Sequence, residues 1–150
     1  MKIRIIPFQS KEYEQSVEKR DAWLRKPLGL SLTSIDTQDD DWQTHFAAFE
    51  GDEIVGVLIM KPHANQEVQM RQVAVDPALQ RHGVGRQLVM EAEKWAKNQG
   101  FSAIFLHARQ YAIDFYLALD YEIISDVYEE VGILHRTMRK VLSFPENSAQ

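Results

Sequence analysis

Residues 80–86 contain the residue types best suited to binding a phosphate group. The segment reads Gln-Arg-His-Gly-Val-Gly-Arg, and an amphipathic stretch begins at its second glycine. Glycine lets the backbone adopt unusual dihedral angles and approach a ligand closely. The first N–H groups of a helix lack internal partners and lie at the positive end of the helix dipole, so a helix that begins here offers an anion site. Arg81 and Arg86 flank the turn and can add charge-assisted hydrogen bonds.

Two well-known phosphate-binding loops do not fit this segment. The dinucleotide fingerprint requires a third glycine after Gly83 and Gly85, and the Walker loop requires a Gly-Lys-Ser/Thr sequence that the chain lacks. A Gly-x-Gly pattern alone is a weak signal. An ordinary helix start with solvated arginines is therefore the competing interpretation.

The flanking elements must hold this segment in place. Residues 67–75 predict a strand, which Asp76-Pro77 ends because proline cannot donate to a ladder. A helix is predicted from residue 85 to residue 98, since four apolar side chains repeat there at helical spacing. The near-continuous apolar run 103–108 predicts a strand with a parallel neighbour and with cover on both faces.

The rest of the chain predicts an α/β (α+β) fold. Residues 2–8 predict an edge strand because of Pro7, and Ser10 is suited to cap the helix that follows it. The remaining predicted elements are an acidic loop at 30–43, a hairpin of strands 45–50 and 53–61, a short helix at 112–119 with Phe115, Tyr116 and Leu119 directed inward, strands 121–125 and 133–142, and a polar tail at 144–150. This order predicts a single domain, residues 1–150, with a mixed, mostly antiparallel central sheet and helices on both faces.

Composition narrows the class of protein. The 150 residues include 17 lysines and arginines against 22 aspartates and glutamates, which gives a net charge of −5. This balance argues against nucleic acid as the main partner. With no cysteine, the chain has no disulfide scaffold, no thiolate nucleophile and no thiolate metal ligand. No apolar run approaches the roughly 20 residues that span a bilayer, so we expect a cytoplasmic protein without a membrane partner.

Two motifs together resemble those of the GNAT superfamily of N-acetyltransferases. Residues 80–85, Gln-Arg-His-Gly-Val-Gly, are similar to the family's Q/R-x-x-G-x-G/A loop for the pyrophosphate of acyl-CoA, and residues 73–77 resemble the strand and exit turn before it. Residues 108–121 resemble the family's A-x-x-x-A-x-x-F-Y-x-x-x-G-F/Y stretch. The resemblance covers residues 45–124 well, and the motifs stand in the family's order. It implies the GNAT fold, in which two adjacent parallel strands splay apart.

One position departs from the family pattern. Asp120 stands where the family usually has a glycine after the short helix, a place that commonly takes the left-handed conformation. Weaker similarity at residues 23–30 and 130–138 resembles the ElaA-like subgroup. An ordinary helix exit and an ordinary strand are the alternative interpretation of those two segments.

The resemblance implies acetyl-CoA as co-substrate, held in the opening between strands 67–75 and 103–108. It implies that the backbone of Val73 and Val75 pairs with the pantetheine amides, and that an N–H group near Ala74 or Val75 polarises the thioester oxygen. The resemblance also implies contacts with the other parts of acetyl-CoA. The pyrophosphate would be held by Gln80, Arg81, His82, Gly83, Val84, Gly85 and Arg86, and the pantetheine arm would pack along Ala112 and Phe115.

The implied reaction is direct attack of a primary amine on the thioester carbonyl. Tyr116 matches the family tyrosine that acts as general acid toward the leaving thiolate, with a core tyrosine as the alternative. An alkylammonium has a pKa of about 10.4, so a proton must also be removed from the acceptor. The candidate proton acceptors, none favoured over the others or over a chain of waters, are Glu67, His107, Glu122, Glu130 and His135.

Other chemistries find little support in the sequence. The five histidines show no HxH or HExxH spacing, so no metal is expected. The nucleophile elbow G-x-S-x-G of many hydrolases is also missing. The acidic run Asp39-Asp40-Asp41 predicts a solvated loop, with a less favoured alternative in which it attracts a cationic acceptor.

The leading hypothesis is therefore an acetyl-CoA-dependent N-acetyltransferase, and the rival is a non-catalytic module that binds or senses acyl-CoA. The rival would keep the phosphate loop yet cleave no thioester. The sequence leaves open whether the acceptor is a small amine, an aminosugar, a polyamine or a protein amine, and whether acyl groups other than acetyl are used. A homodimer is the expected oligomer on general grounds.

Overall fold

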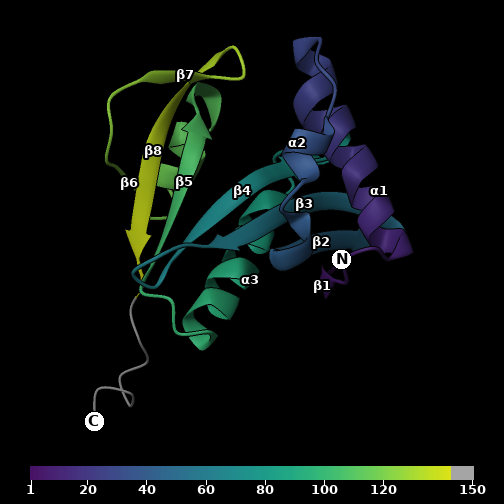
Figure 1. The fold of residues 1–150 in the computed structure, drawn as a ribbon, viewed down its shortest axis with the longest axis horizontal. Helices are drawn as coiled ribbons and strands as arrows, with labels where there is room; N and C mark the ends of the chain where they lie inside the picture. The colour runs from purple at the N-terminus through teal and green to yellow at the C-terminus, as the bar shows by residue number, and fades with distance from the viewer. Residues whose placement is uncertain (143–150) are drawn as a thin grey trace. The chain divides into compact units, whose positions relative to one another are not determined.

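The computed structural model describes residues 1–142, so the predicted polar tail at 144–150 lies outside the described residues. The strands are β1 (Lys2–Ile6), β2 (Thr44–Glu50), β3 (Glu53–Pro62), β4 (Glu67–Val75), β5 (Ala103–Arg109), β6 (Glu122–Ile123), β7 (Tyr128–Glu130) and β8 (Ile133–Val141), and the α-helices are α1 (Lys11–Arg20), α2 (Ser34–Thr37), α3 (Val84–Asn98) and α4 (Ile113–Leu117) (Figure 1). Short 3-10 turns cover Lys26–Leu28, Asp40–Trp42, Pro77–Leu79 and Gln110–Ala112, and a π-helical turn covers Asp21–Arg25. Within residues 1–142, no helix has the length and apolar character needed to cross a bilayer.

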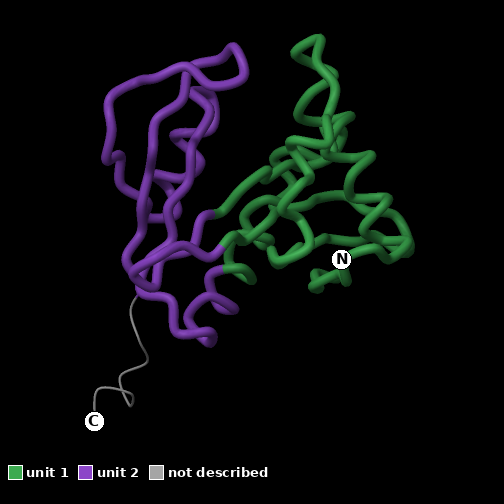
Figure 2. The backbone as a smooth tube through the Cα atoms, in the orientation of Figure 1, with its two compact units in different colours: residues 1–61, 70–92 green, residues 62–69, 93–150 purple. Residues whose placement is uncertain are grey.

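One sheet runs through the chain in the order β1-β2-β3-β4-β5-β8-β6, with β7 paired to β8. The contacts divide the chain into two compact units (Figure 2). Unit 1 contains residues 1–61 and 70–92, and unit 2 contains residues 62–69 and the described part of the chain from Glu93 onward. The mixed, mostly antiparallel sheet predicted from the element order is confirmed, whereas the splay of β4 from β5 stays a prediction.

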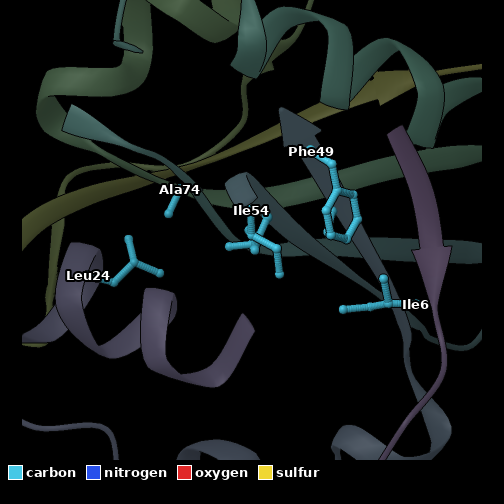
Figure 3. Close-up of a cluster of buried hydrophobic side chains, with 7 residues drawn as sticks. Ile6, Leu24, Phe49, Ile54 and Ala74 are labelled. Carbon is cyan, nitrogen blue, oxygen red and sulfur yellow. The ribbon is translucent and has the colours of Figure 1, made fainter. Parts of the chain in front are cut away.

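Unit 1 is built on an antiparallel sheet. β1 pairs with β2, and β2 pairs with β3 across the predicted Gly51-Asp52 turn, where Gly51 has a φ of +59°. β1 is the first strand in the sheet order and therefore an edge strand, as predicted. Figure 3 shows how side chains from β1, the turn after α1, β2, β3 and β4 meet in one apolar cluster. The cluster comprises Ile6, Leu24, Ala47, Phe49, Ile54, Val57 and Ala74, with Trp23 packed against it.

The first helix begins as predicted. Ser10 accepts a hydrogen bond from the Tyr13 N–H and caps α1. The helix runs on through the π-helical turn and the 3-10 turn to Gly29, whose φ of +73° ends it. The prediction of a plain loop at 30–43 was wrong, because this stretch forms α2, closed by a capping box, and the 3-10 turn Asp40–Trp42.

Unit 2 is centred on β8, which pairs antiparallel with β5, β6 and β7. β7 was not predicted, because three residues are too few for a periodic signal. Burial along β5 also differs from the prediction of cover on both faces. His107 is exposed and Phe105 and Arg109 are only half-buried, while the residues between them are buried. β5 therefore has one apolar face and one accessible face.

The short helix α4 ends as its sequence suggested. Asp120 has a φ of +71°, the left-handed conformation expected where the family usually has glycine. The Tyr121 N–H then donates to the Tyr116 carbonyl and closes the turn. Tyr116 and Ile113 are buried as expected of an inward face, but Phe115 is exposed, so the prediction that it points inward was wrong. Leu119 is half-buried.

Candidate functional site

The turn before α3 is open to solvent. Asp76 caps the 3-10 turn Pro77–Leu79 through the Ala78 N–H, and the chain then enters residues 80–83. Arg81 and Gly83 both have positive φ, +71° and +87°, which turn the backbone into the helix. Gln80, Arg81, His82 and Arg86 are exposed, Gly83 and Gly85 are half-buried, and Val84 is buried.

The helix start leaves a set of backbone donors free. The Gln87 N–H is bonded to the Gly83 carbonyl at 3.1 Å, but in residues 1–142 the N–H groups of Val84, Gly85 and Arg86 have no acceptor. No acidic residue lies in this first turn. Free amides, the positive helix end and two exposed arginines make this place fit an anion such as a diphosphate.

α3 is packed closely onto the sheet by Gly56 of β3. A β-carbon at Gly56 would lie 2.7 Å from Leu88 Cδ1 and 3.0 Å from Val84 Cγ1. Val84 is the first residue of α3, and Leu88 is fully buried one turn later. The absence of a side chain at residue 56 therefore sets how near the helix start can approach β3.

The end of β4 is irregular just before the residues implied to bind the thioester. Gln72 has a φ of +51°, which interrupts the regular pleat of the strand. Val73 and Val75 are half-buried and Ala74 is buried in the core cluster. The Asp76 N–H donates to the Val55 carbonyl at 2.9 Å, which anchors the strand's exit to β3.

A buried polar cluster holds this irregular segment, and the sequence reasoning missed it. Arg20 is fully buried, and its Nη1 lies 2.7 Å from Oδ2 of the equally buried Asp40. Tyr13 Oη donates to the same oxygen at 2.6 Å, and Arg20 Nε donates to Gln72 Oε1. The prediction of a solvated acidic loop was therefore wrong for Asp40. The helical spacing of Tyr13, Arg20 and Leu24 on one face of the helix was a usable signal.

The cluster extends to three further side chains. His45 Nε2 lies 2.9 Å from the Asp40 carbonyl oxygen, and Arg71 Nη1 donates to Gln43 Oε1 at 2.7 Å. Burial lowers the pKa of His45 and of Arg71 and raises the pKa of Tyr13 to about 12. Among the described residues 1–142, no hydrogen-bond partner exists for the buried atoms Arg20 Nη2, Asp40 Oδ1 and Gln43 Nε2. Burying polar atoms without partners costs free energy of folding, so the other hydrogen bonds of the cluster must offset this cost.

Unit 2 contains the implied general acid. Tyr116 is buried, with its ring packed edge-on against Phe115 and Tyr121 at centroid distances of 5.0 and 5.7 Å. Burial raises its pKa well above the ordinary value of tyrosine, so the phenol stays protonated. Its hydroxyl makes no hydrogen bond within residues 1–142 and is therefore free to donate one. Ala112, at the end of the preceding 3-10 turn, is half-buried.

The five candidate proton acceptors are sorted by their surroundings. Glu67 accepts a hydrogen bond from Arg139 Nε at 3.1 Å, and Glu122 is exposed in β6. The other three gather on β5, β7 and β8: His107 Nδ1 lies 3.0 Å from Glu130 Oε1, and His135 Nε2 lies 3.7 Å from Glu130 Oε2. In the part of the chain that the structure describes, no three His, Asp or Glu side chains are arranged to hold one metal ion.

Comparison with known proteins gives a family and several relatives. The sequence profile of the acetyltransferase (GNAT) family matches residues 5–121. The chain is 32% identical over 88 residues to the UPF0039 protein C11D3.02c of Schizosaccharomyces pombe. This alignment covers 57% of this chain and 59% of that protein. The chain is also 37% identical over 59 residues to the uncharacterized N-acetyltransferase YvbK of Bacillus subtilis, in an alignment that covers 39% of this chain and 38% of YvbK. These matches thus span about three fifths and two fifths of the two relatives.

Solved structures share the fold over nearly the whole chain. A candidate N-acetyltransferase from Lactobacillus plantarum has a TM-score of 0.84 and 26% identity, covering 95% of this chain and 100% of that chain. Escherichia coli ElaA has a TM-score of 0.80 and 21% identity, covering 93% and 99%. An aminoglycoside 6'-N-acetyltransferase complexed with coenzyme A has a TM-score of 0.78 and 17% identity, covering 97% and 99%. The profile match and the shared fold together show that this chain belongs to the GNAT family of acetyltransferases.

Proposed function

We propose that this protein transfers the acetyl group of acetyl-CoA to a primary amine by direct attack of the amine on the thioester. The observation that carries the proposal is the open start of α3, where the N–H groups of Val84, Gly85 and Arg86 are free and two arginines are exposed. This turn fits the diphosphate of coenzyme A. The class of reaction, acetyl transfer, is inferred from membership of the GNAT family.

The residues of unit 1 have binding and polarising roles in this proposal. The turn 80–86 holds the pyrophosphate, and the backbone of Val73 and Val75 pairs with the pantetheine amides. An N–H group at Ala74 or Val75 donates to the thioester oxygen as negative charge develops there. Ala112 and Phe115 are assigned to the pantetheine arm in this proposal, and the exposed side chain of Phe115 is available for such a contact.

Tyr116 assists departure of the thiolate. A thiol has an ordinary pKa of about 8.5, below the raised pKa of this buried phenol. Complete proton transfer from Tyr116 to the thiolate is therefore uphill. The hydroxyl serves best as a hydrogen-bond donor to the leaving sulfur, which lowers the barrier without losing its proton.

A thiol-release assay with acetyl-CoA across a panel of primary amines tests the proposal. We expect turnover with at least one amine, and a large loss of acetyl-CoA binding in Gly83→Asp, because the new carboxylate repels the diphosphate. Gly51→Asp is the matched control, since both glycines have positive φ and open space around them. It also places an aspartate at a positive φ but leaves the α3 turn intact.

The rival function is a non-catalytic acyl-CoA-binding module. It predicts tight binding of acetyl-CoA without thiol release for any amine. Absence of both binding and release would refute the proposal itself.

A further inference from the structure

The proposed function leaves open which group removes the proton from the acceptor ammonium. The structure narrows this choice because three of the five candidates form one cluster in unit 2. Glu67 is engaged by Arg139, and Glu122 has no orienting partner in residues 1–142. In the remaining cluster, both His107 and His135 lie against the carboxylate of Glu130.

His107 occupies the accessible face of β5. It pairs with Thr137 of β8 in the sheet register, and its side chain is 35% exposed. His135 is 3% exposed, so its ring is not available to an external substrate. Of the two histidines, only His107 has a ring that an acceptor or a bridging water can reach.

Glu130 determines which nitrogen of His107 holds the proton. A carboxylate can only accept, so the 3.0 Å contact with Glu130 Oε1 requires a proton on His107 Nδ1. In the neutral ring, the lone pair then lies on Nε2. That nitrogen has no hydrogen-bond partner within residues 1–142 and is ready to accept a proton.

The surrounding groups support this arrangement. Tyr128 of β7 packs edge-on against His107 at 5.8 Å and stacks on His135 at 6.0 Å, and its hydroxyl bonds Thr137 Oγ1. His135 Nδ1 is bonded to the Ile133 carbonyl, while its Nε2 faces Glu130 Oε2. Glu130 is therefore the acid that faces both rings.

We propose that His107 is the general base of the transfer and that Glu130 is its positioning residue, an inference that rests on the proposed function. His107 Nε2 takes one proton from the acceptor ammonium, directly or through one water. The neutral amine forms the new C–N bond, and the C–S bond breaks. The second proton of the nitrogen balances the thiolate, which leaves as the free thiol, and the imidazolium returns its proton to solvent.

Replacing each partner tests the pair by steady-state kinetics. In His107→Gln we expect kcat/KM for the amine to fall roughly 10²–10⁴-fold at neutral pH, the usual contribution of a general base. Acetyl-CoA binding should not change. The activity of the variant should recover as the pH approaches the pKa of the amine, because the acceptor then arrives deprotonated. Glu130→Gln should cause a smaller loss, and the double variant should be no worse than His107→Gln alone.

The control is His63→Gln, which removes another exposed histidine of unit 2 that bonds Gln69. It should keep wild-type rates and the wild-type pH profile. If His107→Gln turns over within threefold of wild type, or shows an unchanged profile, the assignment of the base is wrong while the transferase function stands. If the wild-type protein releases no thiol with any amine, the proposed function itself fails.

A measurement that needs no acceptor keeps the inference testable in every case. Long-range ¹H–¹⁵N spectra of the full chain report the tautomer of each neutral histidine. We expect the Nδ1–H form for His107 in wild type and a shift toward the Nε2–H form in Glu130→Ala. An Nε2–H tautomer in the wild-type protein would overturn the assignment, because the nitrogen offered to the substrate would then be a donor.

Discussion

Gly56→Ala is a sharp test of how the sheet positions the phosphate-binding turn. The new methyl group would lie 2.7 Å from Leu88 Cδ1, 3.0 Å from Val84 Cγ1 and 3.5 Å from the Ala74 carbonyl oxygen. Leu88 is 0% exposed, so its methyl cannot swing into solvent. Val84 is β-branched and has one strongly preferred rotamer in a helix. Both side chains have little room to rotate away, so we expect the strain to be relieved mainly by moving the start of α3 away from β3.

The expected cost is that of overpacking a core, about 1–3 kcal/mol. The φ of Gly56 is not positive, and alanine is better suited than glycine to a strand interior. A loss of stability in Gly56→Ala would therefore come from the steric clash of the new methyl group and not from the backbone conformation at residue 56. Since a shift of Val84 displaces the free amides, acetyl-CoA affinity should fall as well, tenfold for each 1.4 kcal/mol of lost interaction.

Urea denaturation measures the free energy of unfolding, and calorimetry measures acetyl-CoA binding. Gly132→Ala is the control: Gly132 has a φ of +79° and open space around it, so alanine there adds backbone strain without a clash. It should lose stability yet keep its acetyl-CoA affinity. Full stability and unchanged affinity in Gly56→Ala would refute the argument that residue 56 sets the position of α3.

Three further predictions concern the buried cluster and Tyr116. Asp40→Asn strands the buried Arg20 guanidinium and should lower the free energy of unfolding by about 3–5 kcal/mol in urea, whereas exposed Asp41→Asn should change it by less than about 0.5 kcal/mol. Because the pKa of Tyr13 is raised to about 12 in the folded state, the stabilisation it provides is complete below about pH 10 and is lost as the pH rises toward 12; Tyr13→Phe should flatten this alkaline decline, and an unchanged slope would contradict the argument. Tyr116→Phe should reduce kcat while leaving acetyl-CoA binding intact, and a pure loss of binding would instead indicate a packing role.

Much of unit 1 was predictable because its signals are local. The hairpin at Gly51, the cap at Ser10 and the strand end at Asp76 each depend on one or two residues with strong backbone preferences. The start of α3 was predicted within one residue for the same reason. The left-handed conformation of Asp120 followed from its place in a known motif.

The buried cluster was not predictable because burial depends on distant partners. Asp40 is one of three consecutive aspartates, and no local feature separates it from its exposed neighbour Asp41. It is buried because Arg20, twenty residues earlier, and Tyr13 provide its hydrogen bonds. The contact between Glu130 and His107 has the same origin, since it requires that the unpredicted strand β7 fold back onto β8.

The distinction between the proposed phosphate-binding turn and the proposed base makes a last prediction possible. The turn before α3 belongs to unit 1, whereas His107 and Glu130 belong to unit 2. In the proposed mechanism, the turn before α3 acts on acetyl-CoA binding, which precedes chemistry, whereas His107 and Glu130 act on proton transfer during chemistry. Gly83→Asp should therefore raise the KM for acetyl-CoA with kcat largely kept at saturation, and His107→Gln should lower kcat with that KM kept. Because the two effects concern different steps, their free energies should add in the double variant, and strong coupling between them would show that the turn also takes part in the chemical step.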